Sequence, residues 1–193
     1  MLWNLLRRRP PAPLPTPTPT PVTPADPSLG VVFGWQVHTA QEAWTGKVDA
    51  KASILLALEG GLLAAVLAGS AQDGLLISLH GWRQISTWIG TACLTVAIVL
   101  AALAVMPSLG RARTHKQEAA DNFIYFGHLR HLDPAVLAAC LGNLNADKQL
   151  SMLTRQLTTM SRANWRKHCY VRWSVIGILI AITTISTAIT WPR

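Results

Sequence analysis

The chain contains 193 residues, of which 50% are hydrophobic and only 13% are charged, whereas a soluble globular domain usually carries about a quarter charged residues. This composition excludes an ordinary soluble domain as the simplest interpretation and favours a membrane-associated one. The net charge of +8 does not by itself indicate nucleic-acid binding, which would also require a recognition motif, so we expect no nucleic-acid partner.

The first 30 residues form a proline-rich leader. They contain nine of the twelve prolines, including the run "PTPTPTP". Such a run favours an extended, polyproline-like chain that does not pack into a core. We therefore predict a disordered leader over residues 1–30 and a folded domain over residues 31–193.

Three apolar blocks follow the leader, at residues 52–71, 87–106 and 173–190. As helices, blocks of 18 to 20 residues are about 27–30 Å long, the thickness of the hydrocarbon core of a bilayer. The alternative, three buried helices of a soluble bundle, is disfavoured because such helices rarely stay apolar on all faces for this length. We predict an all-α, three-span membrane protein with a helical cytosolic bundle formed by residues 31–51 and 107–172.

The first span belongs to one long helix, predicted from about residue 35 to residue 70. Its cytosolic part carries an apolar stripe at helical spacing, formed by Val37, Ala40, Trp44 and Val48. Within the membrane, small residues share one face and permit close helix packing within or between subunits. They are Ala57, Gly61, Ala64 and Ala68.

Glu59 is the only ionisable side chain in the three apolar blocks, and it lies opposite this small-residue face. An unpaired carboxylate in lipid is costly, so the group must be protonated, hydrogen-bonded or hydrated. The nearest hydroxyl groups at similar depth are predicted to be those of Thr95, Thr183 and Thr184. The acid either holds the resting bundle and lines a wet path when the helices rearrange, or is satisfied by one threonine alone.

Basic residues predict the orientation. Five Lys or Arg residues precede the first block, one lies between the first two blocks, ten lie in residues 107–172 and one follows the last block. Basic loops stay cytoplasmic. We therefore expect the N-terminus to be cytoplasmic and the C-terminus to be external.

The segment between the second and third spans is predicted to be helical. One helix is expected over residues 114–128 and a second over 134–141, opened by Asp133-Pro134. A final helix, capped by Asn145, carries an apolar stripe of Leu150, Leu153, Leu157 and Met160 and continues into the third span. The stretch "NFIYFGHL" can either line a pocket for a planar ring or form a buried aromatic cluster.

Three motifs carry a family resemblance. "WTGKVDAKASILLAL", with Trp44, Asp49, Lys51, Ala52 and Ser53, resembles the opening signature of the Pycsar transmembrane effectors. "NFIYFGHLRHLDPAVL" and "DKQLSMLTRQLTTMSRANWRKH" resemble the cytosolic motif and final stalk of that family, and the likeness covers residues 35–190. It implies an anti-phage effector that binds cyclic UMP or cyclic CMP made by a neighbouring cyclase, impairs the inner membrane and causes abortive infection.

A ligand with one phosphate and a planar base requires a cationic or amide clamp and a stacking surface. The candidate ligand-binding residues are Trp44, Asn122, Tyr125, His128, Arg130, Arg155, Gln156 and Arg162. The candidate gating or intramembrane residues are Asp49, Lys51, Glu59, Gly61, Thr95 and Thr183. Asp49 and Lys51 can alternatively form an internal pair at the membrane boundary.

No catalytic constellation is evident, so we expect neither an enzyme nor a cofactor. Cys93, Cys140 and Cys169 lack metal-ligand spacing, and we expect no metal and no disulfide. We expect the partners to be a cyclic mononucleotide, the lipid bilayer and further copies of the chain. The alternatives are a non-gated, holin-like membrane-perturbing protein, a membrane adaptor that recruits a soluble partner, and an enzyme that acts on lipid.

Overall fold

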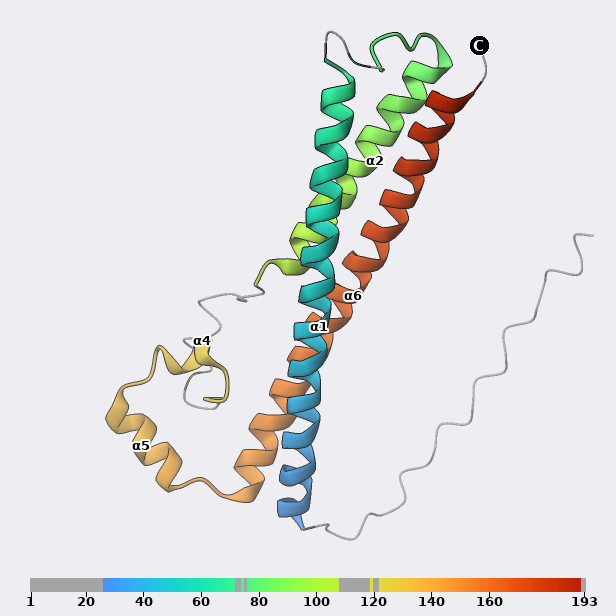
Figure 1. Cartoon of the computed structure of the whole chain (residues 1–193). Coiled ribbons are helices and arrows are strands. Elements are labelled where there is room, and N and C mark those ends of the chain that lie inside the picture. Colours follow the sequence, from blue (N-terminus) through green and yellow to red (C-terminus); the bar gives the residue numbers. More distant parts are fainter. Residues whose placement is uncertain (1–25, 72–73, 75, 108–118, 120–121, 192–193) are drawn as a thin grey trace, which may run out of the picture.

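The computed structural model describes residues 26–71, 74, 76–107, 119 and 122–191, and these form helices and turns without a strand (Figure 1). The helices are α1 (Pro27–Gly69), α2 (Trp82–Val105), α4 (Phe126–Leu129), α5 (Pro134–Gly142) and α6 (Ala146–Thr190). Helices α1, α2 and α6 are long and apolar enough to cross a membrane. The all-α, three-span prediction is thus confirmed, while most of the predicted leader lies outside the described residues.

Helix α1 begins eight residues earlier than predicted because Asp26 and Pro27 form a strong start signal. The Asp26 carboxylate accepts a hydrogen bond from the Ser28 amide at 2.9 Å, and proline suits the first helical turn. Gly30 and Gly34 do not interrupt the helix. Instead, they leave room for Leu150 and Leu153 of α6 to pack directly against the backbone of α1.

Helices α1 and α6 run parallel and share a heptad seam. The buried residues of α1 recur at spacings of three, four and seven, and most buried residues of α6 do the same, which is the a/d pattern of a coiled coil. In α1 they are Val31, Gly34, Gln41, Val48, Ala52 and Glu59, and in α6 the matching set is Leu153, Asn164, Lys167, Ser174, Ile178, Ala181 and Ala188.

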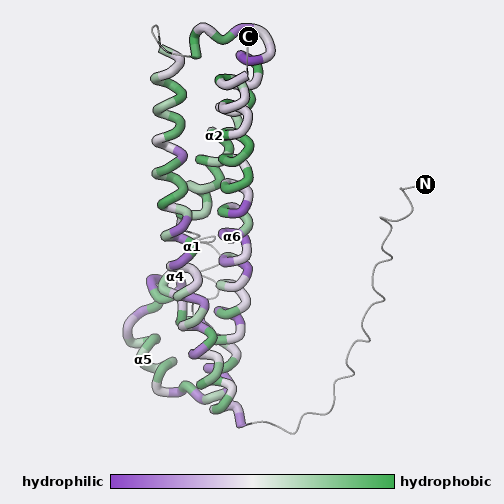
Figure 2. Tube along the Cα trace, turned by 45° about the vertical axis from the view of Figure 1, so that its right-hand side comes forward, coloured by the Kyte–Doolittle hydropathy of each residue, from purple (hydrophilic) through white to green (hydrophobic). Residues whose placement is uncertain are grey.

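This seam departs from the predicted stripe on α1. Trp44 is 54% exposed rather than packed, although Val48 is buried as expected. The seam includes a glycine and a glutamine, which a search for apolar residues does not detect. The parallel pair extends from the polar half of the molecule into the apolar half (Figures 1 and 2).

Helix α2 joins this pair only in the apolar half, where it packs against α6 through small residues. Ala97, Ala101 and Ala104 are fully buried, and Gly90 faces Thr184 and Ile185 of α6. Such residues let helix backbones approach closely in a membrane. The core of this half is formed by Leu94, Ile178 and Ala181, with Leu62 and Leu63 of α1 beside it.

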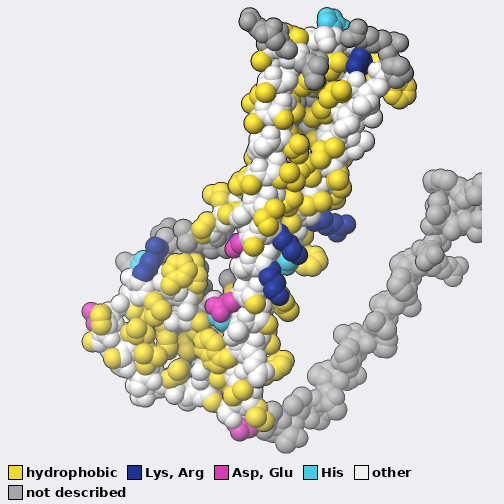
Figure 3. Space-filling view, viewed as in Figure 1, with side chains coloured by type: hydrophobic (Ala, Val, Ile, Leu, Met, Phe, Trp, Pro, Cys, Tyr) yellow, Lys and Arg dark blue, Asp and Glu magenta, His cyan; other side chains and the backbone are white. Residues whose placement is uncertain are grey.

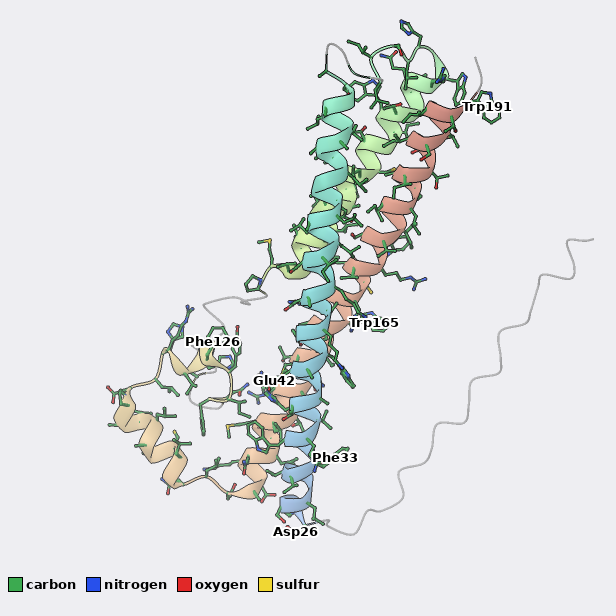
Figure 4. All side chains as sticks on the ribbon, in the orientation of Figure 1. Asp26, Phe33, Glu42, Phe126, Trp165 and Trp191 are labelled. Atoms are coloured by element: carbon green, nitrogen blue, oxygen red, sulfur yellow. The ribbon has the colours of Figure 1, made fainter. Side chains whose placement is uncertain are left out.

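The far ends of α2 and α6 are tied by a cation and an aromatic pair. Arg83 donates hydrogen bonds to the carbonyl oxygens of Ala188 and Ile189, at 2.6 and 3.1 Å. A cation at this position also complements the negative end of the α6 dipole. Trp82 packs edge-to-face on Trp191, with ring centroids 5.8 Å apart, and Figure 4 shows Trp191 at the end of α6.

The short helices α4 and α5 form a small lobe beside the first turns of α6 (Figure 1). The helix predicted over residues 114–128 lies partly outside the described residues. Among the described ones the prediction is wrong for residues 122–125, which are not helical, whereas residues 126–128 belong to α4. The Tyr125 ring folds back over Gly127, which has no side chain to obstruct it. Helix α5 and the Asn145 cap of α6, which accepts from the Lys148 amide at 2.9 Å, are found as predicted.

We predict that Gly90→Ala destabilises the chain and that Gly60→Ala does not. A Cβ atom at Gly90 would lie 2.6 Å from Ile185 Cγ1 and Thr184 Oγ1, whereas one at Gly60 would meet nothing within 4 Å. Overpacking costs about 1–3 kcal/mol, while alanine otherwise favours a helix by about 1 kcal/mol relative to glycine. Unfolding of both variants in detergent measures this difference, and equal stability would contradict the close α2–α6 packing.

Candidate functional site

The seam between α1 and α6 contains three polar layers, one above the other along the two helices. The first joins Thr45 to Asn164, the second joins Asp49 to Lys167, and the third joins Glu59 to Ser174. The first two lie in the polar half of the molecule and the third lies within the apolar half. These three layers extend from the part of the chain beside the small lobe to the predicted spans.

Asn164 of α6 forms the first layer with two groups on α1. The Thr45 hydroxyl lies 2.6 Å from Asn164 Oδ1, and Asn164 Nδ2 donates to the Gln41 carbonyl oxygen at 3.2 Å. Asn164 is 8% exposed and Gln41 is 7% exposed, so water contributes little here. A polar residue at one such position of a coiled coil specifies its register at some cost in stability.

Asp49 and Lys167 form the second layer as an ion pair, with Nζ and Oδ1 2.5 Å apart. The Lys167 side chain is 10% exposed and the Asp49 side chain 36%, so this pair is shielded more than an ordinary surface pair. The alternative pairing of Asp49 with Lys51 is not found. Lys51 follows Asp49 by two residues, which places it on a different face of the helix, and its side chain is exposed.

Glu59 and Ser174 form the third layer, and both residues are fully buried. The Ser174 hydroxyl donates to Glu59 Oε1 at 2.5 Å, while Glu59 Oε2 has no hydrogen-bond partner among the described residues. A buried carboxyl group with one of its two oxygens unpaired is an unusual and costly arrangement. Glu59 therefore depends on one side-chain hydrogen bond, which it receives from α6.

The threonines predicted to hold Glu59 do not contact it. Thr95, Thr183 and Thr184 each direct the hydroxyl group to a backbone carbonyl oxygen one turn earlier in the same helix. Threonine hydroxyls in membrane helices commonly satisfy themselves in this way. The prediction matched residues by depth alone, whereas the heptad register brings Ser174 opposite Glu59.

The small-residue face of α1 packs against neither α2 nor α6. Ala57, Gly61, Ala64 and Ala68 are all exposed, and a Cβ atom added at Gly61 would meet nothing within 4 Å. Small residues that do pack inside the apolar half include Ala97 and Ala101 of α2 and Ala181 of α6. The prediction that this face and Glu59 serve different partners is consistent with this arrangement, since Glu59 faces α6.

The predicted ligand residues lie in three places. Trp44 lies on α1 and is largely exposed, while Gln156 and Arg162 lie on α6 with Arg155. Near α4, the Tyr125 ring centroid is 5.5 Å from that of His128 and 4.5 Å from that of Phe126. The rings do cluster, but Phe126 is 61% exposed, so this is not the buried aromatic cluster considered from the sequence.

Other members of this set differ in their surroundings. Asn122 and His128 are buried, and Arg130 is exposed with its Nε 3.1 Å from His131 Nε2. Arg155 lines a cavity between α5 and α6. Figure 4 shows Phe126 on the side of α6 that carries the small lobe and Trp165 on the opposite side.

Sequence reasoning missed Gln41, Thr45, Asn164 and Ser174, which together form most of the polar seam. Each is an ordinary polar residue in a long helix, and no motif distinguishes it. A count of heptad positions would have indicated them. Gln41 lies seven residues before Val48, and Thr45 lies fourteen residues before Glu59. In α6, Ser174 lies seven residues after Lys167, and Asn164 lies three residues before Lys167.

The sequence model of PycTM, the Pycsar effector protein domain, matches residues 33–192, which is most of the chain and includes all three predicted spans. The chain belongs to the Pycsar effector family. No curated protein and no solved structure matches it significantly. Membership places this Pycsar effector in anti-phage defence, where the family implies a cyclic nucleotide signal from a partner cyclase.

We predict that Asp49 and Lys167 of this Pycsar effector stabilise the fold as a coupled pair. Asp49→Asn, Lys167→Gln and the double variant should give a coupling free energy of about 1–2 kcal/mol, between the values for exposed and buried pairs. Lys51→Gln is the matched control, since Lys51 is exposed and forms no ion pair with another described residue. Unfolding in detergent measures all four variants, and additive effects of the two single changes would contradict the pairing.

Proposed function

We propose that this chain is an inner-membrane effector that cyclic UMP or cyclic CMP activates, and that the active form impairs membrane integrity and causes abortive infection. The carrying observation is α6, a single helix of 45 residues that runs from the small lobe to the far end of the apolar half. Its parallel pairing with α1 gives a ligand-induced movement a direct path into the spans. This continuity favours a gated effector over a holin-like protein, which requires no such polar half.

The proposed orientation places the polar half and the N-terminus in the cytoplasm and the C-terminus outside. Figure 3 shows Lys and Arg side chains gathered on the visible face where the apolar surface ends. Basic residues beside the cytoplasmic end of a span are the usual sign of orientation. The cyclic nucleotide made by a cytoplasmic cyclase would then reach the small lobe directly.

The proposed activation predicts that nucleotide controls leakage. Liposomes that contain the purified chain should release an encapsulated dye on addition of cyclic UMP or cyclic CMP, and not on addition of cyclic AMP or cyclic GMP. A ligand shifts the equilibrium between resting and active states only through unequal affinity for them, so binding calorimetry should be run in parallel. Equal release without nucleotide would support the holin-like alternative, and binding without release would support the adaptor.

The Glu59–Ser174 layer predicts a defect in gating that is separate from binding. Glu59→Gln keeps the side-chain shape but removes the ionisable group, and Ser174→Ala removes the hydroxyl that bonds to it. Both variants should bind nucleotide within about twofold of the unaltered chain and release dye at a different nucleotide concentration or rate, because the layer holds the resting α1–α6 pair.

Ser53→Ala is the matched control, since Ser53 is exposed on α1 and bonds only within its own helix at 2.9 Å. Dye release and calorimetry on the three variants decide the question. If Glu59→Gln and Ser174→Ala behave like Ser53→Ala, the acid has a packing role and no gating role.

We further propose that the exposed small-residue face of α1 forms the contact between copies in a homo-oligomer. Gly61→Leu should reduce the assembly size, because the larger side chain prevents close approach of two helices. Gly46→Leu is the control, since Gly46 also meets nothing within 4 Å but lies outside the apolar block. Light scattering after size-exclusion chromatography measures the assembly, and an unchanged Gly61→Leu assembly would place the contact elsewhere.

A further inference from the structure

A cavity of about 540 Å³ lies between α5 and the first turns of α6. Its volume falls within the range of ordinary small-molecule pockets, about 300–1,000 Å³. The wall on the α5 side includes Val136, Ala139 and Cys140, and the α6 side carries Lys148, Ser151 and Arg155. Figure 3 shows apolar side chains gathered over this part of the small lobe.

The apolar wall is unusual for a segment outside a membrane span. Helix α5 has the sequence PAVLAACLG, which contains no charged or polar uncharged side chain, and none of its residues is buried. Val136, which lines the cavity, is 48% exposed. A water-facing helix normally buries one apolar stripe against a neighbour, and here the cavity separates α5 from α6. An occupant with a flat, weakly polar surface would cover this wall.

The opposite wall is cationic. Lys148 and Arg155 are seven residues apart on α6, so they lie on one face with Ser151 between them, and the three side chains reach the same cavity. Neither cation forms an ion pair with another described residue, and Asp147 is the only acid in α6. Paired cations beside a hydroxyl group suit a phosphate, and arginine in particular binds its oxygens in a bidentate manner.

Phe123 adds an aromatic side chain to the same cavity. It belongs to the "NFIYFGHL" stretch that the sequence singled out, although Phe123 was not among the predicted ligand residues. A half-buried phenyl ring beside an apolar helix provides a stacking surface for a base. The cavity therefore combines a cationic subsite that can bind a phosphate with an apolar subsite that can cover a planar base, within the length of two helical turns.

We propose that this cavity binds a cyclic mononucleotide, with the phosphate held by Lys148 and Arg155 and the base covered by Phe123 and the α5 wall. This inference rests on the proposed function, because the ligand class comes from there, and it adds the location of the site. The cavity also lies next to the α1–α6 seam, through which the proposed gating would act. Met152 lines the cavity, and the next residue, Leu153, packs on Gly34 in the α1–α6 seam.

The test uses the full chain, purified in detergent, and calorimetry with cyclic UMP and cyclic CMP. Ala139→Trp fills the cavity and should abolish measurable binding of the nucleotide that the unaltered chain binds. Ala138→Trp is the matched control, because Ala138 is the preceding residue of α5, is exposed and does not line the cavity. It should bind as the unaltered chain does.

A second pair of variants tests the phosphate subsite without altering the cavity volume. Arg155→Gln should weaken binding at least about tenfold, as expected for loss of a hydrogen bond between charged groups. Arg166→Gln removes an exposed cation from the same helix outside this cavity and should leave affinity within about twofold. Arg155 is exposed, so its replacement should not affect folding, which the unfolding midpoint verifies.

The outcomes separate this inference from the function it rests on. If the unaltered chain binds cyclic UMP or cyclic CMP and the Ala139→Trp and Arg155→Gln variants bind it equally well, the site is wrong and the proposed function stands. If the unaltered chain binds neither nucleotide, the proposed activation fails and this assignment fails with it. Loss of binding in both variants, with both controls intact, establishes the cavity as the nucleotide site.

Discussion

The heptad seam between α1 and α6 fixes where the rest of the molecule lies, because two parallel helices that pair along their length permit only a few alignments. The three polar layers reduce these to one. Sliding α6 by one heptad, about 10 Å, in one direction would bring Met160 to the level of Asp49, and in the other direction would bring Ala181 to the level of Glu59. Each slip leaves a charged or polar group opposite an apolar one, which costs several kcal/mol in a buried site.

The two interfaces of α6 differ in their chemistry. The α2–α6 interface consists of alanine and glycine at close approach, with Arg83 on the terminal carbonyl groups of α6. Close packing of this kind has few alternative arrangements. The α1–α6 interface instead combines apolar packing, such as Leu153 on Gly34, with hydrogen bonds between individual side chains, such as those of Asn164 and Ser174. The polar layers therefore specify how α1 aligns with α6, while the small residues of α2 specify how closely α2 approaches α6.

The features that the sequence could predict are those that depend on local patterns. Apolar length gave the three spans, Asp133-Pro134 gave the start of α5, and the Asn145 cap gave the start of α6. Each depends on residues that lie close together in the chain.

The features that could not be predicted from the sequence depend on the pairing of segments that lie far apart in the chain. The partner of Glu59 lies 115 residues away, at Ser174, and the partner of Asp49 lies 118 residues away, at Lys167. Matching by membrane depth allowed several hydroxyl groups for Glu59, because depth does not specify which face of each helix points inward. A search for apolar periodicity did not detect the α1–α6 seam, because Gly34 and Gln41 occupy positions where an apolar residue was expected. For the proposed ligand cavity, the sequence offered Arg155 as one of several candidates but did not indicate that a cavity would separate α5 from α6.

The outer part of α1 has a mechanical consequence for the whole chain. Beyond Glu59 no residue of α1 up to Gly69 is buried. Leu62 and Leu63 still pack beside the core, but a second cavity, of about 260 Å³ and lined by Leu62 and Val66, leaves a gap between part of this segment and α6. In the proposed gating, the last polar layer would act as a pivot, and the ten residues after it would form an arm of about 15 Å. A small rotation at the pivot would produce a larger sideways displacement at the end of this arm. In the proposed orientation that end lies in the outer leaflet, which would then be disturbed first.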